Sequence, residues 1–485
     1  MCYNIVSMSI SKFELQDFRC FKERQELLFA IPNPNIVGSG LTYIVGENNS
    51  GKTTLLEAMH FSNRLGVEAS TLRSSDAKSP NTHFTFFDEG GYIIQDLHRR
   101  RDRAYSLMDR ADGEHGVLAD LVFIPSRRYW NPRVLNRHNI DSARANIGNY
   151  SSSLRRLMDQ GDSSQIADVF YSIEEDDTFY SEYISIMKQI FPDFESFTVR
   201  SEDYIYIAYE MSDGHEHRAD FLGDGIASIM RIAAHLVLRQ STNEVLIIDE
   251  PELSLHPVAK KRLIKMLAKK AMTQQIVLAT HEPYFVVWEY IKNGAKVNCV
   301  RKDKETHEST IYTLGDFSRY RGIANAGNWQ QPYLADIVSR EIFFCDNILF
   351  VEGQEDVGLL KDKVDDGINI FGYGVRGFSN FKYALTLAQD MELRKVGAII
   401  DNGNAESSIY NDLMNEFSDY CVIKWDRNDI RDKTGSFPMA NSGEPDLDAA
   451  KQPKNGYFDE NGNFKVNDFG DFYEKIEQIN SYFNQ

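Results

Sequence analysis

The segment Gly46–Thr53 constrains the fold of this chain more than any other, because it reads Gly-Glu-Asn-Asn-Ser-Gly-Lys-Thr and matches the pattern GxxxxGK[ST]. The apolar run Leu41–Val45 precedes it, and apolar residues at helical spacing follow it. In such a strand–loop–helix setting, glycines let backbone N–H groups surround phosphates at a helix N-terminus. Lys52 would neutralise β- and γ-phosphate charge, and Thr53 would bind Mg²⁺. We therefore predict a nucleotide site made by Gly46, Asn48, Asn49, Ser50, Gly51, Lys52, Thr53 and Thr54.

Two acidic residues, Asp249 and Glu250, follow the apolar run Val245–Ile248 much later in the chain. In a parallel sheet, Asp249 would hold Mg²⁺ directly or through water, and Glu250 would act as the general base on the attacking water. The next apolar run, Ile276–Ala279, ends in Thr280-His281. His281 would contact the γ-phosphate and sense ATP against ADP, and its alternative is a hydrogen-bonded structural histidine.

A glycine pair, Gly223 and Gly225, precedes the apolar helix that begins near Ile226. Two glycines at a helix start can expose N–H groups to a phosphate, here one bound by a second subunit. The alternative is a plain turn that initiates the helix.

The phosphate loop, the acidic pair and the strand-end histidine together resemble the ABC-type ATPase head of the RecF-like and SMC-like group. In that group the signature segment of one subunit completes the nucleotide site of the other, so that ATP holds a dimer together. The signature here, Gly223-Asp-Gly225, lacks the serine that is usual in that group.

The C-terminal part repeats the pattern of acids after apolar runs: Glu352-Gly353 follows Ile348–Val351, and Asp401 follows Val396–Ile400. With the glycine turn after a second strand, this order resembles the TOPRIM metal-dependent fold. The resemblance implies carboxylates that bind one or two Mg²⁺ ions and cleave a phosphodiester. It implies metal binding or acid/base catalysis for Glu352, metal binding for Asp356, Asp401 and Glu406, and stabilisation of phosphorane charge for Lys433. Asp426 and Asp429 are the alternative to Glu406.

An ABC-type head followed by a TOPRIM domain resembles the overcoming-lysogenisation-defect (OLD) family of ATP-dependent nucleases, most closely its retron-associated branch. The resemblance implies an ATP-hydrolysing, Mg²⁺-dependent DNA endonuclease of anti-phage defence, active as a dimer or higher oligomer. Its cofactors would be ATP and Mg²⁺, with Mn²⁺ as an alternative at the nuclease site. Its partners would be DNA and either retron RNA or msDNA or a companion defence protein. Because Gly403 stands where TOPRIM has a second acid, the alternative is a regulatory ATPase with a degenerate TOPRIM domain, binding protein or RNA without cleavage.

The predicted fold class is α/β, because apolar strands alternate with helical segments in both halves of the chain. We expect an ABC-type ATPase in two parts, residues 1–128 and 196–330, separated by a helical insertion over residues 129–195 that would serve dimerisation. A TOPRIM-like nuclease domain with a C-terminal tail would occupy residues 331–485.

The composition is that of a globular chain of 485 residues with a net charge of −19 and five scattered cysteines. The cysteines form no CxxC pair, which argues against a disulfide framework and a cysteine-rich zinc site. No secretory signal or membrane span is evident, so we expect a cytoplasmic protein. A basic path for nucleic acid would need local positive charge. Candidates are Arg99–Arg103, Arg127-Arg128 and the helical run Lys260–Lys270, whose alternative is a solvated face.

Overall fold

The computed structural model describes residues 9–62, 82–99, 109–112, 121–126, 166–201, 205–219, 223–238, 244–320, 340–353, 356–357, 360, 363–365, 367–372, 380–402, 406–425 and 472–484. The chain divides into two compact units, residues 1–313 and 314–485. Lys433, Gly403, Arg127-Arg128 and most of the predicted insertion lie outside the described residues. No helix in the described part of the chain is long and apolar enough to cross a membrane.

A six-stranded sheet forms the centre of unit 1, in the order β14-β13-β3-β12-β11-β7. Its strands are β3 (Leu41–Val45), β7 (Leu121–Ile124), β11 (Val245–Asp249), β12 (Gln275–Ala279), β13 (Lys296–Lys302) and β14 (Ser309–Thr313). Every pair is parallel except β13 with β14. The strands β3, β11 and β12 are buried throughout, as the continuous apolar runs predict. Their carboxyl ends meet at one edge, and this edge carries the predicted nucleotide site.

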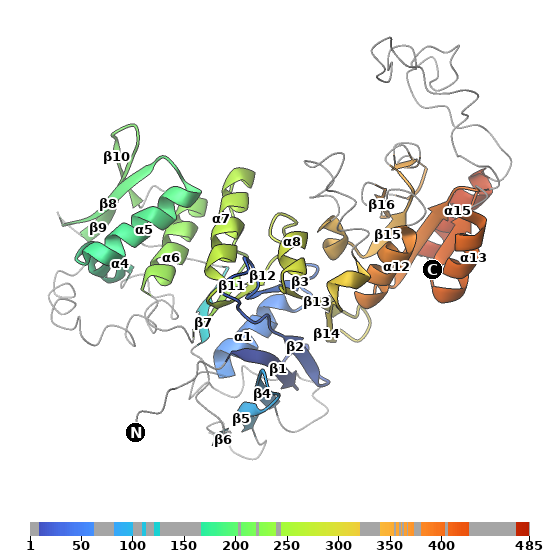
Figure 1. Ribbon diagram of the computed structural model, residues 1–485, viewed down its shortest axis with the longest axis horizontal. Coiled ribbons are helices and arrows are strands. Elements are labelled where there is room, and N and C mark those ends of the chain that lie inside the picture. Colours follow the sequence, from blue (N-terminus) through green and yellow to red (C-terminus); the bar gives the residue numbers. More distant parts are fainter. Residues whose placement is uncertain are drawn as a thin grey trace, which may run out of the picture. The chain divides into compact units, whose positions relative to one another are not determined.

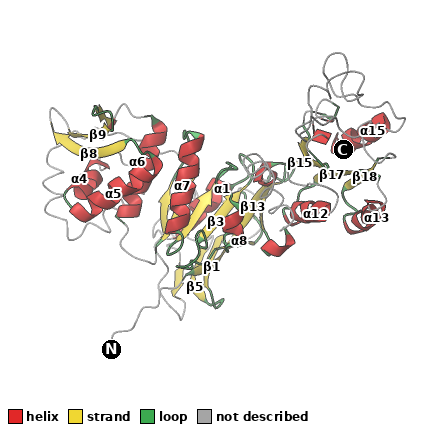
Figure 2. Ribbon diagram, turned by 45° about the horizontal axis from the view of Figure 1, so that its top comes forward, coloured by secondary structure: helices red, strands yellow, loops and turns green. Residues whose placement is uncertain are grey.

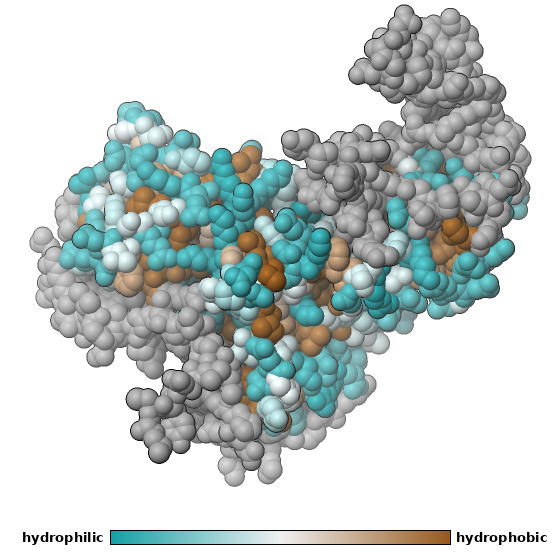
Figure 3. All heavy atoms as spheres, viewed as in Figure 1, coloured by the Kyte–Doolittle hydropathy of each residue, from teal (hydrophilic) through white to brown (hydrophobic). Residues whose placement is uncertain are grey.

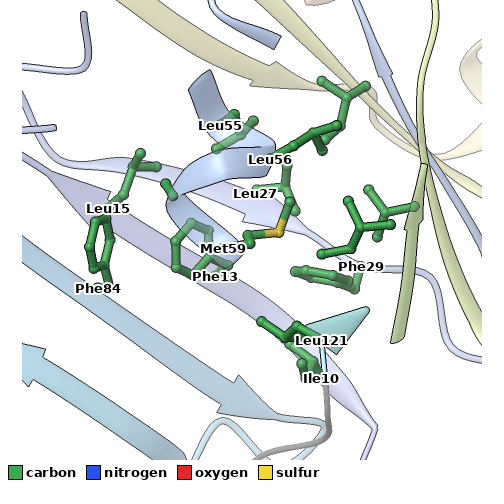
Figure 4. Packing of buried hydrophobic residues seen from close by; sticks show 14 of the residues in the cluster. Ile10, Phe13, Leu15, Leu27, Phe29, Leu55, Leu56, Met59, Phe84 and Leu121 are labelled. Carbon is green, nitrogen blue, oxygen red and sulfur yellow. The ribbon is translucent and has the colours of Figure 1, made fainter. Parts of the chain in front are cut away.

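A second, antiparallel sheet packs with helix α1 (Lys52–Ser62) against this centre, in the order β2-β1-β4-β5-β6. Its strands are β1 (Ile10–Gln16), β2 (Gln25–Leu28), β4 (Thr82–Asp88), β5 (Ile93–Arg99) and β6 (Asp109–Asp112). Figure 4 shows Leu55, Leu56 and Met59 of α1 close to Phe13 and Leu27 of this sheet. One buried cluster therefore holds α1, and with it the phosphate loop, between the two sheets.

A third group of elements in unit 1 contains α4 (Ile166–Glu174), α5 (Asp177–Ile190) and α6 (Asp224–Val237). They lie beside the antiparallel strands β8 (Phe194–Ser201), β9 (Ile205–Met211) and β10 (Glu216–Arg218), as Figure 1 shows. Helix α5 begins where Asp176 accepts hydrogen bonds from Thr178 N and Phe179 N. The predicted helical insertion thus ends in helices, which pack on a small sheet whose first strand starts at Phe194.

Helices α7 (Pro257–Lys270) and α8 (Trp288–Lys292) complete the described part of unit 1, and α7 lies alongside the strands of the central sheet (Figure 2). It connects β11 to the parallel strand β12, so the sequence from Val245 to Ala279 is a strand–helix–strand unit.

Unit 2 is built on a four-stranded parallel sheet in the order β16-β15-β17-β18. Its strands are β15 (Asn347–Phe350), β16 (Asn369–Phe371), β17 (Lys395–Ile400) and β18 (Cys421–Lys424). Its helices are α12 (Phe381–Asp390), α13 (Glu406–Glu416) and α15 (Phe472–Asn484), with short 3-10 turns η5 (Phe317–Arg319) and η6 (Ile342–Phe344). The aromatic rings of Trp425 and Phe472 stack 5.4 Å apart and tie α15 to this core.

Candidate active site

The loop between β3 and α1 has the backbone that its glycines predict. Gly46 (φ 150°), Asn49 (φ 64°) and Gly51 (φ 111°) all have positive φ. A Cβ atom on Gly46 would overlap the carbonyl oxygen of Val300, and one on Gly51 would lie 2.9 Å from Cys20 Sγ. Neither position has room for a side chain, so both glycines are required by close packing as well as by backbone conformation.

Lys52 begins α1 and is only 6% exposed. Its ammonium group donates hydrogen bonds to the carbonyl oxygens of Gly46 (2.9 Å) and Glu47 (2.7 Å). Burial lowers the pKa of Lys52, while the nearby carboxylates of Glu250 and Asp249 act in the opposite direction. The lysine is therefore folded back over its own loop, where a phosphate group would meet a desolvated positive charge.

Thr53 and Asp249 come together from α1 and β11. The hydroxyl of Thr53 donates a 2.9 Å hydrogen bond to Asp249 Oδ2, and Asp249 is 1% exposed. A hydroxyl and a carboxylate oxygen are donors that Mg²⁺ prefers. This pair and the glycine cradle beside it fit a magnesium nucleotide, in the positions that the sequence predicted.

The other loop residues of the prediction lie around the same turn. Ser50 is buried and its carbonyl oxygen accepts a 2.7 Å hydrogen bond from Ser309 Oγ, which fixes the loop to β14. Asn48 and Asn49 are exposed, and Thr54 is partly exposed. The two asparagines are thus on the open side of the loop.

The loop after β11 bends sharply at Glu250, whose φ of 47° is unusual for a residue with a side chain. Its backbone N–H donates to Ala279 O at 2.8 Å, which holds the bend against β12. The bend aims Glu250 Oε1 to 3.6 Å from Nδ1 of His281, and the His281 side chain is 44% exposed. The structure therefore brings together the predicted base and the predicted phosphate-sensing histidine.

Glu252 is a residue of this site that the sequence analysis missed. It is 3% exposed, and its Oε1 accepts hydrogen bonds from Thr280 Oγ1 (2.7 Å) and His281 N (3.2 Å). Burial raises the pKa of the Glu252 carboxyl, and the Thr280 hydrogen bond opposes this. A third acid just after Asp249 and Glu250 was the available signal, but a carboxylate in a turn is ordinarily a surface residue.

The two glycines before α6 have different surroundings. Gly223 is the N-cap of α6, and a Cβ atom there would meet nothing within 4 Å. Gly225 lies in the first turn, and a Cβ atom there would overlap the carbonyl oxygen of Ser254 in the loop after β11. Gly225 therefore has a packing role within its own chain, whereas among the described residues none packs against the Cβ position of Gly223.

In unit 2 the predicted acids gather at the carboxyl ends of β15 and β17. Glu352 Oε1 accepts a 2.9 Å hydrogen bond from the backbone N–H of Asp401, and both residues are partly exposed. Asp356 is buried, and its Oδ2 accepts from Gly353 N at 2.9 Å. A Cβ atom on Gly372, after β16, would overlap the Gly353 carbonyl oxygen, so the glycine turn packs directly on the loop that carries Glu352.

Two predicted members of this second site are not placed with it. Glu406 begins α13, but its side chain lies outside the described residues, as does all of Lys433. Among the side chains that the structure describes, no three of histidine, cysteine, aspartate or glutamate are grouped to hold a metal ion. Of the acids predicted for the nuclease site, the side chains that the structure describes are thus a neighbouring pair, Glu352 with Asp401, and a turn residue, Asp356.

One known protein family matches a part of the chain that includes both the phosphate loop and His281. Residues 41–287 match the family described as "AAA domain, putative AbiEii toxin, Type IV TA system". That range begins at β3 and ends just before α8, so it contains the nucleotide-site residues and none of unit 2. No curated protein matches the chain.

Solved structures of SMC head domains are similar to part of the chain. The head domain from Thermotoga maritima is 13% identical over 64% of this chain and 100% of its own, with a TM-score of 0.39. The Pyrococcus furiosus head domain, with an extended coiled coil and bound to the C-terminal domain of ScpA, is 12% identical over 63% and 96%, with a TM-score of 0.43. An SMC head bound to the winged-helix domain of ScpA is 14% identical over 63% and 97%, also at 0.43.

Proposed function

The chain belongs to this family of AAA domains, a family of P-loop ATPases, and on that premise we propose that it hydrolyses ATP in unit 1 to control a Mg²⁺-dependent DNA endonuclease in unit 2. The observation that carries the first half is the 2.9 Å hydrogen bond between Thr53 and Asp249, which joins the phosphate loop to β11. In this proposal the protein acts in anti-phage defence, as OLD-like nucleases do.

The proposed hydrolysis assigns one task to each residue of the site. Mg²⁺, held at Thr53 and Asp249, would neutralise charge on the β- and γ-phosphates. The loop N–H groups and Lys52 bind the phosphates, and Lys52 leaves the Gly46 and Glu47 carbonyls to do so. Glu250 orients the attacking water and accepts its proton, while His281 donates a hydrogen bond to the γ-phosphate.

The site would be completed by a second copy of the chain. The ATP held by one subunit would be contacted by N–H groups at the start of α6 in the other, where Gly223 leaves the backbone uncovered. This arrangement makes ATP binding the step that closes a dimer and hydrolysis the step that opens it.

The proposed nuclease site rests on Glu352 and Asp401. They follow neighbouring parallel strands, β15 and β17, and the Asp401 N–H bonds to the Glu352 carboxylate. Carboxylates so placed can share a Mg²⁺ ion, or Mn²⁺ in its place, whose chemistry is to activate a water and stabilise the leaving oxygen. The charge at Lys433 would add to that stabilisation.

The solvent face of α7 supplies a surface for the DNA. Its basic residues are Lys260, Lys261, Arg262, Lys265, Lys269 and Lys270, and the helix has no acidic residue. Lys260 and Lys270 form ion pairs with Glu282 and Glu182, whereas Lys261, Lys265 and Lys269 are exposed in one row at a spacing of four residues. Hydrophilic atoms dominate the surface around α7 in Figure 3. Like charges at this spacing repel each other on a helix, and bound phosphates would relieve the repulsion.

A nicking assay on supercoiled plasmid tests the nuclease. With Mg²⁺ or Mn²⁺ present, the wild type should nick, and Glu352→Ala and Asp401→Ala should each lose about 10²-fold or more of that activity. The matched control is Asp419→Ala, which removes an exposed acid of the same unit. Metal-dependent nicking that is indifferent to both active-site changes would reject this site. Absence of nicking by the wild type would favour a regulatory ATPase whose unit 2 binds a protein or RNA partner.

A further inference from the structure

We propose that Glu252 is a positioning residue for ATP hydrolysis, which acts by fixing His281 at the γ-phosphate. The inference rests on the proposed function, because it takes His281 as the residue that contacts that phosphate. Glu252 itself lies beneath the site with 3% of its surface exposed, so it has no direct access to the nucleotide.

The contacts of Glu252 define the conformation of the turn after β12. One carboxylate oxygen, Oε1, accepts from the Thr280 hydroxyl (2.7 Å) and from the His281 backbone N–H (3.2 Å). The same oxygen lies 3.6 Å from Nδ1 of the His281 ring. The Thr280 hydroxyl oxygen also accepts from Glu282 N at 3.0 Å, so a single carboxylate organises three consecutive residues.

Two carboxylates therefore flank the same ring nitrogen, because Glu250 Oε1 also lies 3.6 Å from Nδ1 of His281. Glu250 is the partly exposed one, and in the proposed mechanism it turns toward the attacking water. Glu252 is held by two hydrogen bonds and stays in place during that change. The ring orientation consequently depends on Glu252 when Glu250 is engaged with water.

A buried glutamate at position 252 lowers the stability of the folded state, and a turn with a structural role alone would not need it. Its second oxygen, Oε2, is buried and has no hydrogen-bond partner among the described residues. Burying a carboxylate that is only half satisfied destabilises the folded state. An apolar residue would avoid this cost, so the acceptor geometry at Oε1 is the property that the site uses.

A double-mutant cycle tests whether Glu252 acts through His281. The full-length chain is measured as wild type, Glu252→Ala, His281→Ala and the double variant, with kcat and KM for ATP in each. Glu252→Ala and His281→Ala should each lower kcat by about tenfold or more, with KM changed by no more than about twofold. The double variant should match His281→Ala within about twofold, since the effect of Glu252 requires the histidine.

Three further variants separate positioning from folding. Glu252→Gln keeps an oxygen acceptor and should recover most of the kcat lost in Glu252→Ala. Thr280→Val removes one donor and should fall between wild type and Glu252→Ala, which keeps the test open if Glu252→Ala does not fold. Glu289→Ala removes an exposed glutamate of unit 1 and should behave as wild type.

The possible failures are distinguishable. A wild-type kcat in His281→Ala would remove the proposed role of the histidine, and the role of Glu252 with it. If His281→Ala lowers kcat and adding Glu252→Ala lowers it further by the same factor as in the single variant, the two residues act independently. That result would overturn the positioning role of Glu252 alone. A wild-type kcat in Glu252→Ala or Thr280→Val would do the same.

Discussion

Acidic residues follow parallel strands in both units, but their surroundings differ. In unit 1, Asp249 is 1% exposed and hydrogen-bonded to Thr53, and the next residue is held in a positive-φ bend against β12. In unit 2, Glu352 and Asp401 are partly exposed and share one hydrogen bond. The side chain of Asp249 is buried and hydrogen-bonded before any ligand arrives, whereas those of Glu352 and Asp401 are partly exposed to solvent.

This difference has a consequence for the effect of substitutions. Where a site is preorganised, the residues act as a unit, and removing one removes most of the activity. Where the carboxylates are partly exposed to solvent, metal binding must bring them together, and activity should depend on the metal concentration. Lys52→Ala and Glu250→Gln in unit 1 should therefore have effects at least as large as those of Glu352→Ala and Asp401→Ala in unit 2.

One of the largest expected effects is that of Lys52→Ala on ATP turnover. Removing a buried cation from the phosphate loop should lower kcat by about 10²–10³-fold, because no other basic residue of the predicted nucleotide site can replace it. The control is Lys296→Ala, which removes an exposed lysine of unit 1. A loss of less than about tenfold would mean that the loop is less preorganised than its geometry indicates.

Acid should destabilise unit 1 selectively through His235, whose ring nitrogen Nε2 is buried. Burial, aided by the charge of Arg231, lowers the pKa of His235 to about 3, and residues 314–485 contain no histidine. Below about pH 6.5 the unfolded chain therefore binds a proton at His235, whereas the folded chain does not. The contribution of neutral His235 to the free energy of unfolding is present above pH 6.5 and is lost as the pH falls toward 3.

Urea unfolding at pH 7, 6 and 5 measures this loss. Below pH 6.5, the wild type should lose about 1.4 kcal/mol per pH unit relative to His235→Leu. The exposed residue His215 provides the control, since His215→Leu should follow the wild type at each pH. If the free energies of unfolding of the wild type and His235→Leu differ by the same amount at pH 7, 6 and 5, the lowered pKa of His235 is contradicted.

The glycine pair before α6 should respond unequally to alanine. Gly225→Ala would push a methyl group into the Ser254 carbonyl and should cost about 1–3 kcal/mol of folding stability. Gly223→Ala has free space and should change stability by less than about 1 kcal/mol, while weakening any ATP-dependent dimer. Thermal unfolding and light scattering with ATP measure the two effects, and equal losses of stability would refute this distinction.

The smallest effect expected is on the salt dependence of DNA binding. Replacing Lys261, Lys265 and Lys269 together by glutamine should reduce the slope of log K against log salt by about 2–3, one contact each. The matched control replaces Lys296, Lys302 and Lys304, which are also exposed lysines of unit 1. Equal slopes for the two triple variants would remove α7 from the DNA-binding surface.

The sequence predicted the strands that carry the sites. Leu41–Val45, Val245–Ile248 and Ile276–Ala279 are strands as expected, because continuous apolar runs between turn residues have few alternatives in an α/β fold. The apolar runs Ile348–Val351 and Val396–Ile400 of unit 2 also correspond to strands, β15 and β17, to within one residue at their ends. Strands β4, β5 and β6 were missed, although Phe84 and Phe86 alternate in β4 with partly exposed residues.

The site residues of unit 1 could be predicted from the sequence because they belong to a contiguous motif or follow a strand directly. Glu252 could not, since its role comes from contacts with Thr280 and His281, which follow β12 and are remote in sequence. The packing of Gly225 on Ser254 was hidden for the same reason. Burial of a single carboxylate in a turn cannot be predicted from local sequence, because it is decided by long-range packing.

The most direct test of two separate catalytic centres is the ATP turnover of Glu250→Gln and Glu352→Ala, each assayed beside the wild type. Glu250→Gln should bind ATP but turn it over about 10²–10⁴-fold more slowly, because it lacks the base. Glu352→Ala should turn over ATP within about twofold of the wild type, since its carboxylate belongs to the other site. Wild-type turnover in Glu250→Gln, or a matching loss in Glu352→Ala, would contradict two separate catalytic centres.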